Sequence, residues 1–150
     1  MTLRILLADD HALFRQAINL TLLTLPNIEI VAEVTNGQDV LSMVRQSQPD
    51  VVCMDINMPK LNGVEATREL HTIFPEIKII GLSSHIDPYL AARMIDAGAL
   101  AYVDKASAGS DLPMAIHLAL QNKFFLSPGL GIKDAAELAQ YIDNSPTADN

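Results

Sequence analysis

The sequence predicts a doubly wound α/β fold in which five parallel strands alternate with helices. Two observations favour this fold class. Five short apolar runs, bounded by polar or turn-forming residues, recur along the chain as is typical of buried strands. The segments between them carry apolar residues at helical spacing and are joined by short loops. This alternation implies a parallel sheet with right-handed crossovers, for which we expect the strand order 2-1-3-4-5.

The expected strands differ in how much of their surface should be buried. Residues 51–54 are apolar throughout, which indicates a strand covered on both faces, and turn formers such as Asn57, Pro59 and Gly63 end it. Residues 28–34 alternate in part, as expected nearer an edge of the sheet. The expected strands are residues 3–8, 28–34, 51–54, 77–82 and 100–103.

The first expected helix begins after Asp10, whose carboxylate can cap it, and ends before Pro26. Its apolar residues Leu13, Ala17 and Leu20 recur at i, i+4 and i+7. We expect this stripe to be the face that packs on the sheet.

The later helices have start and stop signals of their own. Asp87 and Pro88 open the fourth helix, and Gly98 is suited to cap its C-terminus. Ser110 can cap the fifth helix, which places Pro113 in the first turn, where proline is tolerated. The expected helices after the first are residues 38–47, 63–74 and 88–97 and a helix that begins after Ser110.

The character of the chain changes after Lys123. We assign residues 1–125 to the main domain and residues 126–150 to a linker, a short helix and a disordered tail. Residues 134–142 carry apolar residues at i, i+3, i+4 and i+7, so this extra helix is expected to pack on the domain or on a second copy. The 25 residues after position 125 hold one lysine against four acids, too few and too acidic for a DNA-binding domain.

Composition argues against several classes of function. The formal net charge of -8 disfavours non-specific nucleic-acid binding, because phosphate neutralisation needs clustered Lys and Arg. No apolar stretch approaches the roughly 20 residues of a membrane span, and acidic residues follow the N-terminus too soon for a signal peptide. We therefore expect a cytoplasmic protein without membrane contact. The single cysteine, Cys53, excludes an internal disulfide and is expected to be inert core packing.

Acidic side chains follow two strands that are expected to be neighbours. Asp9 and Asp10 close the first strand, and Asp55 follows the third. In the expected strand order these ends share the crevice at the topological switch point, where doubly wound sheets bind ligands. Three carboxylates in one crevice repel one another unless a cation compensates. A cluster of oxygen ligands selects a hard cation. Mg²⁺ fits best, because it binds through one or two carboxylates and leaves coordination positions open for phosphoryl oxygens.

Two further strand ends carry complementary groups, the hydroxyl of Ser83 and the ammonium of Lys105. A lysine is a mobile point charge that is suited to a phosphoryl oxygen. Together these residues predict in-line phosphoryl transfer to a carboxylate, with the metal and the lysine neutralising charge on the equatorial oxygens. The product is an aspartyl phosphate.

Four segments resemble, in order and spacing, the receiver domain of two-component response regulators. They are ADDH at 8–11, MDINMPKLNG at 54–63, LSSH at 82–85 and GALAYVDK at 98–105, and the likeness extends over residues 3 to about 123. The resemblance implies a flavodoxin-like (βα)5 fold and a phosphorylation-switched signalling domain. One departure is Ala106 after the lysine, where the family often has proline.

The resemblance also implies a role for each residue of the crevice. Asp55 accepts the phosphoryl group from a sensor histidine kinase, and Lys105 pairs with a phosphoryl oxygen. Asp10 and Asp55 ligate Mg²⁺ directly. Asn57 contributes its backbone carbonyl, and Asp9 helps through water.

The same resemblance implies how the signal leaves the site. Ser83 is the switch hydroxyl, and Tyr102 is the aromatic residue that changes rotamer with it. The motifs also resemble receivers that precede a LuxR-like helix-turn-helix domain, which implies the regulatory part of a transcription regulator, truncated or single-domain. Such a chain forms homodimers and reaches DNA only through a further domain. It catalyses nothing beyond its own phosphotransfer and autodephosphorylation.

Other functions share parts of this pattern. An aspartate-nucleophile phosphohydrolase of the haloacid-dehalogenase type would need a second Asp two residues after Asp55, where Asn57 stands. A nucleotide-binding module would need a Gly-rich first loop, and ADDH follows the first strand instead. Taken singly, Asp9 and Asp10 could be helix caps. His11 is expected to be a surface or helix-end residue.

Overall fold

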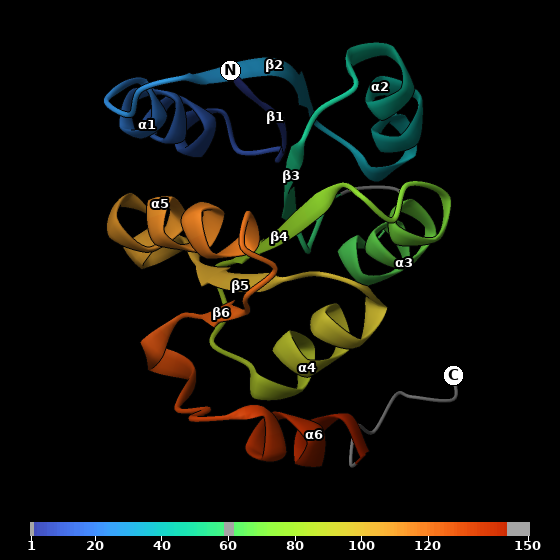
Figure 1. Ribbon diagram of the computed structural model, residues 1–150, viewed down its shortest axis with the longest axis vertical. Coiled ribbons are helices and arrows are strands. Elements are labelled where there is room, and N and C mark those ends of the chain that lie inside the picture. The colour runs from blue at the N-terminus through green and yellow to red at the C-terminus, as the bar shows by residue number, and fades with distance from the viewer. Residues whose placement is uncertain (1, 59–61, 144–150) are drawn as a thin grey trace.

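Parallel strands form one six-stranded sheet in the computed structural model, which describes residues 2–58 and 62–143 (Figure 1). Their order is β2-β1-β3-β4-β5-β6, so the predicted order of the first five strands is confirmed and a sixth strand is added beside β5. The predicted turn residue Pro59 and the predicted disordered tail from 144 onward lie outside the described residues. The strands are β1 (Leu3–Ala8), β2 (Ile28–Val34), β3 (Val51–Asp55), β4 (Lys78–Ser83), β5 (Ala101–Asp104) and β6 (Phe125–Leu126).

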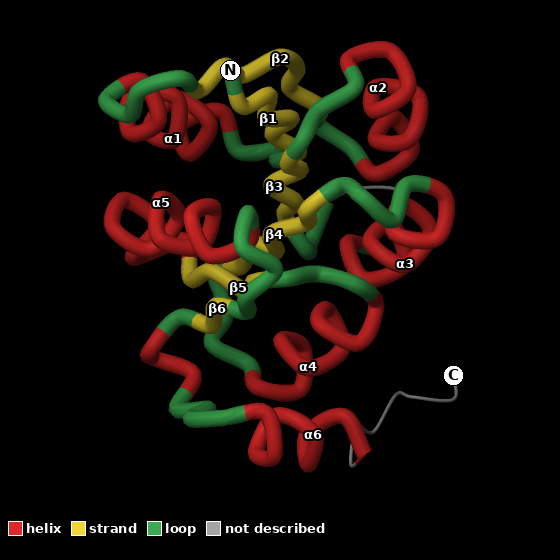
Figure 2. The backbone as a smooth tube through the Cα atoms, in the orientation of Figure 1, coloured by secondary structure: helices red, strands yellow, loops and turns green. Residues whose placement is uncertain are grey.

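Helices cover both faces of the sheet, as Figure 2 shows with helices in red around yellow strands. The helices are α1 (Ala12–Leu23), α2 (Val40–Ser47), α3 (Gly63–Ile73), α4 (Pro88–Ala97), α5 (Ala108–Ala119) and α6 (Ala135–Asp143), with short 3-10 turns η1 (Gly37–Asp39), η2 (Lys105–Ser107) and η3 (Pro128–Leu130). α1 and α5 lie on one face, α2, α3 and α4 lie on the other, and α6 packs outside α4 (Figure 1). Within the described residues no helix is both long enough and apolar enough to cross a membrane.

Apolar side chains fill the space on both sides of the sheet. β3 is buried at every position, as its continuous apolar run predicts. Side chains of successive residues in β1 point to opposite faces of the sheet, because side chains alternate along a strand. Leu6 packs with residues of α2, α3 and α4, whereas Ile5 and Leu7 pack with residues of α1 and α5. The polar residues at the strand ends are therefore held at the edge of a rigid double-sided core.

The predicted inward face of α1 is wrong. Leu13 and Leu20 are 81% and 68% exposed, while Ile18 and Leu22 are buried in the cluster that includes α5. Both pairs have helical spacing in this leucine-rich segment, so the side that faces the sheet depends on the direction in which the chain leaves β1. Asp10 does not cap the helix, because its carboxylate lies in a cluster with other acids, and the N-cap residue is the one after it.

The start of α5 also differs from the prediction. Ser110 is not the cap; it lies in the first turn, and its hydroxyl donates to the Ser107 carbonyl at 3.2 Å. The helix begins earlier because η2 runs directly into it, and the side chain of Asp104 caps η2. Pro113 consequently lies inside the helix, where its missing amide leaves the carbonyl of Gly109 without a helical partner at the exposed start of α5.

The predicted ends of α4 are confirmed. The carboxylate of Asp87 accepts from the amides of Tyr89 and Leu90, and Pro88 occupies the first helical position. Gly98 ends the helix with a φ of +124°, a conformation that favours glycine.

The chain after Lys123 is not a plain linker. Phe125 and Leu126 form β6, which pairs in parallel with β5 beside Ala101 and Tyr102. The Pro and Gly residues that follow form η3 rather than an extended connection. A two-residue strand is too short for its periodicity to be recognised in a sequence. β6 forms because β5 would otherwise leave its backbone hydrogen-bonding groups unpaired on that side of the sheet.

Gly63 begins α3 in close contact with the loop that follows Asp55. Its amide donates to the Ile56 carbonyl at 2.7 Å, and a Cβ at this position would lie 2.5 Å from the Ile56 Cα. We expect Gly63→Ala to lower the free energy of unfolding by about 1–3 kcal/mol, because backbone must move to admit the methyl group. Urea unfolding followed by circular dichroism measures the loss.

The matched control is Gly109→Ala in the first turn of α5, where nothing lies within 4 Å of an added Cβ. This control should leave the free energy of unfolding unchanged or raise it by up to about 1 kcal/mol, because alanine favours the helix. Equal losses in the two variants would contradict the close approach at Gly63.

Cys53 lies in the middle of β3 and is fully buried, and this burial raises the pKa of its thiol to about 12. Because the thiolate is the reactive form, we expect iodoacetamide at about pH 8 to leave the folded chain unmodified. The same reagent should alkylate the chain fully in concentrated urea, where the thiol regains its ordinary pKa. Intact mass measures both results, and rapid labelling of the native chain would contradict the burial.

Candidate functional site

Carboxylates from two hydrogen-bonded neighbouring strands meet at the carboxyl edge of the sheet. Asp9 and Asp10 follow β1, and Asp55 ends β3. One oxygen of each carboxylate and one ring nitrogen of His11 lie within 4.8 Å of one another. Asp9 and Asp55 are buried, whereas Asp10 and His11 reach solvent. A group of this kind can hold a metal ion.

The ammonium of Lys105 compensates the two buried carboxylates. Lys105 follows β5, yet its Nζ reaches past the end of β4 to within 2.6 Å of Asp9 Oδ2 and 3.1 Å of Asp55 Oδ2. Asp9 Oδ2 is buried without a hydrogen bond in the described structure, so this ion pair supplies its compensation. The Nζ also lies 4.7 Å from the centre of the Phe14 ring, which shields one side of the cation.

The carboxylate of Asp55 is held in a fixed orientation. Its Oδ1 accepts a hydrogen bond from the backbone amide of Asn57 at 3.0 Å, and its Oδ2 accepts one from the Lys105 ammonium at 3.1 Å. Burial raises the pKa of Asp55 above the ordinary value, although the Asn57 amide and the Lys105 charge act in the opposite direction and the Asp9 charge adds to the rise. The ionised carboxylate is therefore less stabilised by its surroundings than it would be in water.

The side chains of Ser83 and Tyr102 meet at the backbone of His85. The buried hydroxyl of Ser83 donates to the His85 carbonyl at 3.2 Å and accepts from the His85 amide at 3.0 Å. Tyr102 donates its hydroxyl to the same carbonyl at 2.7 Å. Burial raises the pKa of Tyr102, so its hydroxyl stays protonated and remains a donor at neutral pH. The two residues together hold the loop between β4 and α4.

Two residues of the site were missed in the sequence. His11 is a surface residue at a helix end, as predicted, since its side chain is 62% exposed and it is the N-cap of α1. The prediction missed its contacts: its Nδ1 lies 3.3 Å from carboxylate oxygens of both Asp9 and Asp10 and 3.2 Å from Lys105 Nζ. Phe14 belongs to a helix and lies against the ammonium. The position of His11 directly after two acids was the available signal for it. Phe14 offered no signal, because its contact comes from packing between α1 and the end of β5.

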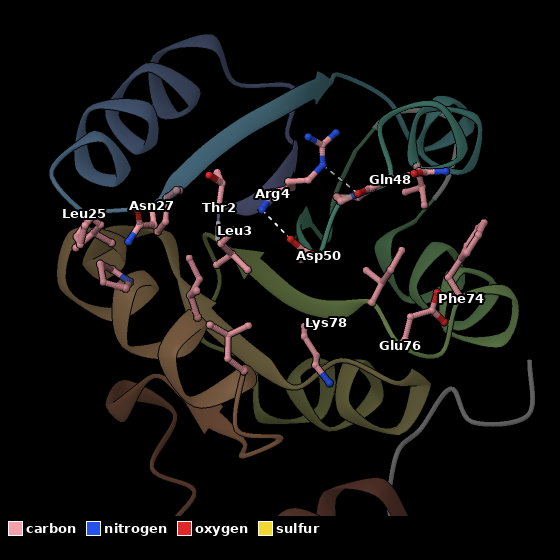
Figure 3. Close-up of a pocket in the computed structure, with 18 of the residues that line it drawn as sticks. Thr2, Leu3, Arg4, Leu25, Asn27, Gln48, Asp50, Phe74, Glu76 and Lys78 are labelled. Carbon is pink, nitrogen blue, oxygen red and sulfur yellow. Dashed lines mark hydrogen bonds between the residues drawn. The ribbon is translucent and has the colours of Figure 1, made fainter.

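A cavity of about 350 Å³ lies beside this site. It is lined by His11, Phe14, Ser84, Asp104, Lys105 and Ala106. A larger hollow of about 1220 Å³ lies at the amino ends of the strands, where the backbone amide of Arg4 donates to the Asp50 carboxylate (Figure 3). The smaller cavity adjoins the carboxylate cluster through His11 and Lys105, whose side chains line it and contact those carboxylates.

The comparisons with known proteins agree with this geometry. The family model of the response regulator receiver domain matches residues 5–117. The chain belongs to the response regulator receiver family. This receiver is 36% identical to the transcriptional regulatory protein DegU of Brevibacillus brevis, over 84% of the chain and 53% of that protein. It is 32% identical to the response regulator GacA of Pseudomonas viridiflava, over 96% of the chain and 68% of that protein.

A solved structure of a LuxR-family two-component response regulator from Aurantimonas sp. SI85-9A1 is similar over the whole receiver. The TM-score is 0.83 at 30% identity, with 93% of this chain and 97% of that chain covered. The predicted family and the flavodoxin-like fold are thereby confirmed, with the sixth strand as the correction. The chain spans about half to two thirds of the length of the curated relatives DegU and GacA.

We expect Asp55→Asn to raise the free energy of unfolding at neutral pH, in the presence of a chelator, by about 1 kcal/mol. The folded-state pKa of Asp55 is raised, so its ionised form opposes folding above that pKa and the variant removes this cost. The gain in stability should shrink as pH falls through the raised pKa of the folded chain. It should vanish below the ordinary pKa of aspartate, where the carboxyl group is neutral in both the folded and the unfolded chain. Urea unfolding between about pH 3 and pH 7 measures it.

The matched control is Asp96→Asn on α4, where the carboxylate is 53% exposed and lies 3.8 Å from Arg68. This exposed pair is worth little, so the control should change the free energy of unfolding by less than about 0.5 kcal/mol. A loss of stability in Asp55→Asn at neutral pH would show that the ion pair with Lys105 outweighs the cost of burial.

Proposed function

We propose that the chain is a phosphorylation-switched signalling receiver that accepts a phosphoryl group onto Asp55. The donor is the phosphohistidine of a sensor histidine kinase. The observation that carries the proposal is the convergence of Asp9, Asp10 and Asp55 with Lys105 at one edge of the sheet. A buried carboxylate beside a buried ammonium and further acids supplies both the nucleophile and the charge stabilisation that phosphoryl transfer requires. Family membership supports the same function.

The chemical step follows from the orientation of Asp55. A carboxylate oxygen attacks the phosphorus, the P–N bond to the donor imidazole breaks, and the imidazole leaves with the bonding electron pair. The backbone amide of Asn57 donates to Asp55 Oδ1 at 3.0 Å and holds the carboxylate in place during the attack. Lys105 is close enough to shift from Asp55 to an oxygen of the incoming phosphoryl group and neutralise its charge.

The donor set fits Mg²⁺. Asp9 Oδ2 is buried and lacks a hydrogen bond within the described residues, and oxygens of three carboxylates lie together around the crevice. Asp10 and Asp55 would ligate the ion directly, the backbone carbonyl of Asn57 would add a ligand, and Asp9 would act through water. When bound, Mg²⁺ supplies Lewis-acid stabilisation of the phosphoryl oxygens.

The output that we propose is transcription regulation. DegU is named a transcriptional regulatory protein, and the matched segment covers 53% of it. Residues 1–125 would act as the receiver of such a regulator, or as a receiver that works through protein contacts, in the cytoplasm and as a homodimer. With a formal net charge of -8, the chain would reach DNA through a further domain rather than through its own surface.

The phosphohydrolase alternative is not favoured by the site. Such an enzyme would need a second carboxylate two residues after Asp55, and the exposed Asn57 stands there. The relatives are response regulators rather than phosphohydrolases. Catalysis by this chain would then be confined to its own phosphotransfer and autodephosphorylation.

Incubation with acetyl phosphate and Mg²⁺ should add one phosphoryl group to the chain, and tandem mass spectrometry should place it on Asp55. Asp55→Asn should remove the labelling, and a chelator should prevent it. Lys105→Ala should slow it by about tenfold or more, because the ammonium stabilises the transferring group.

Asp96→Asn is the control here as well and should be labelled at the rate of the unmodified sequence. Labelling that survives Asp55→Asn would overturn the proposal. Steady turnover of an external phosphate ester such as p-nitrophenyl phosphate would instead support the phosphohydrolase.

A further inference from the structure

The C-terminal helix α6 covers the outer surface of α4. α6 lies along α4 on the side away from the sheet (Figure 1). Leu138 of α6 is buried, and the ring of Tyr141 meets the ring of Tyr89 edge to face with their centres 5.1 Å apart. Leu130, in the segment that leads to α6, is buried in the same core cluster as Met94 of α4. The outer surface of α4 is therefore partly covered by a later part of the same chain.

The covering depends on a short helix. α6 has nine residues, and isolated helices shorter than about 12 residues are marginal in water, so its helical state depends on its contact with α4. The predicted apolar stripe is only partly used, because Leu138 is buried whereas Ala139 is exposed. A short helix that depends on packing against one neighbouring helix belongs to the less stable parts of a domain.

The segment that leads to α6 also contacts the strand and the loop that carry the switch residues. The amide of Ser127 donates to the Tyr102 carbonyl at 3.0 Å, and its hydroxyl accepts from the Asp104 amide at 2.9 Å. Gly129 lies so close to the loop between β4 and α4 that a Cβ on it would be 3.2 Å from Ile86 Cδ1. A movement of that loop therefore changes the surface on which the segment rests.

The position of the loop depends in turn on Ser83. The Ser83 hydroxyl now donates its one hydrogen to the carbonyl of His85 and accepts from the amide of the same residue. If it turns to donate to a phosphoryl oxygen on Asp55, both interactions are lost, and the Tyr102 hydroxyl alone holds the His85 carbonyl. The loop leads directly into α4, where Tyr89 contacts α6.

We infer that α6 is an intramolecular latch on α4 and that phosphorylation of Asp55 loosens it. This inference rests on the proposed phosphoacceptor function. In the unmodified chain the latch keeps the α4 surface from partners. Tyr89 is 40% exposed in the closed structure. Once α6 leaves, the covered side of Tyr89 and the side chains of Leu138 and Tyr141 become accessible together, so that one chemical event at the sheet edge exposes an apolar surface.

Hydrogen–deuterium exchange of the whole chain tests the latch. In the unmodified chain the amides of residues 137–143 should be protected. Phosphorylation with acetyl phosphate and Mg²⁺ should accelerate their exchange by about three- to tenfold, the range expected when an aromatic pair and its packing are lost. The amides of α3 serve as an internal reference and should not change. Asp55→Asn should show no acceleration under the same treatment.

A pair of variants at Tyr141 tests the contact without phosphorylation. Tyr141→Ala should open the latch by itself and accelerate exchange of residues 137–143 to the level of the phosphorylated chain. Tyr141→Phe keeps the ring and should exchange as the unmodified chain does. Unprotected amides in the unmodified chain, or no effect of Tyr141→Ala, would overturn the latch.

The failure of the latch and the failure of the proposed function give different results. Intact mass measures the fraction of chains that carry a phosphoryl group in the exchange sample. Full phosphorylation with unchanged exchange of α6 would overturn the latch and leave the receiver function standing. Absence of phosphorylation would overturn the receiver function itself.

Discussion

The ion pairs of Lys105 with Asp9 and Asp55 are the interaction on which the rest of the structure depends. Two carboxylates buried at the ends of neighbouring strands would repel each other without a cation between them. The cation comes from the end of β5, on the far side of β4, so compensation requires that β1, β3, β4 and β5 lie in this order and end at the same edge. The strand order and the chemistry of the site are thus two aspects of one arrangement.

The same arrangement places a buried carboxylate under opposing electrostatic influences. Burial raises the pKa of Asp55, so ionising this carboxylate costs more free energy in the folded chain than in water, and such perturbed groups are common at functional sites. A cation or a phosphoryl group that engages Lys105 and the carboxylates would redistribute these charges. Ser83 and Tyr102 lie on the neighbouring strands β4 and β5, and their hydroxyls share the carbonyl of His85. From that carbonyl the path to the surface is short, because α4 begins three residues after His85 and α6 rests on α4.

Much of the site could be predicted from the sequence because its residues stand at the ends of apolar runs. Asp9, Asp10, Asp55 and Lys105 each follow a strand, and parallel strands place such residues at one edge whatever the details of packing. The contact made by Phe14 could not be predicted, since it depends on how closely α1 approaches the end of β5.

The sequence by itself determined which segments are strands and helices, their order, and the acids and the lysine at the carboxyl edge, because these follow from local periodicity and from the rules of parallel sheets. Only the tertiary structure decided which stripe of α1 faces inward, where α5 begins, that β6 pairs with β5, and that α6 lies on α4. In each of these cases the local pattern allowed more than one arrangement, as with Leu13 and Leu20 against Ile18 and Leu22. Burial of apolar surface decided the positions of α1 and α6, and the open edge of β5 decided the pairing of β6. These contacts join segments far apart in the chain, which a local pattern does not record.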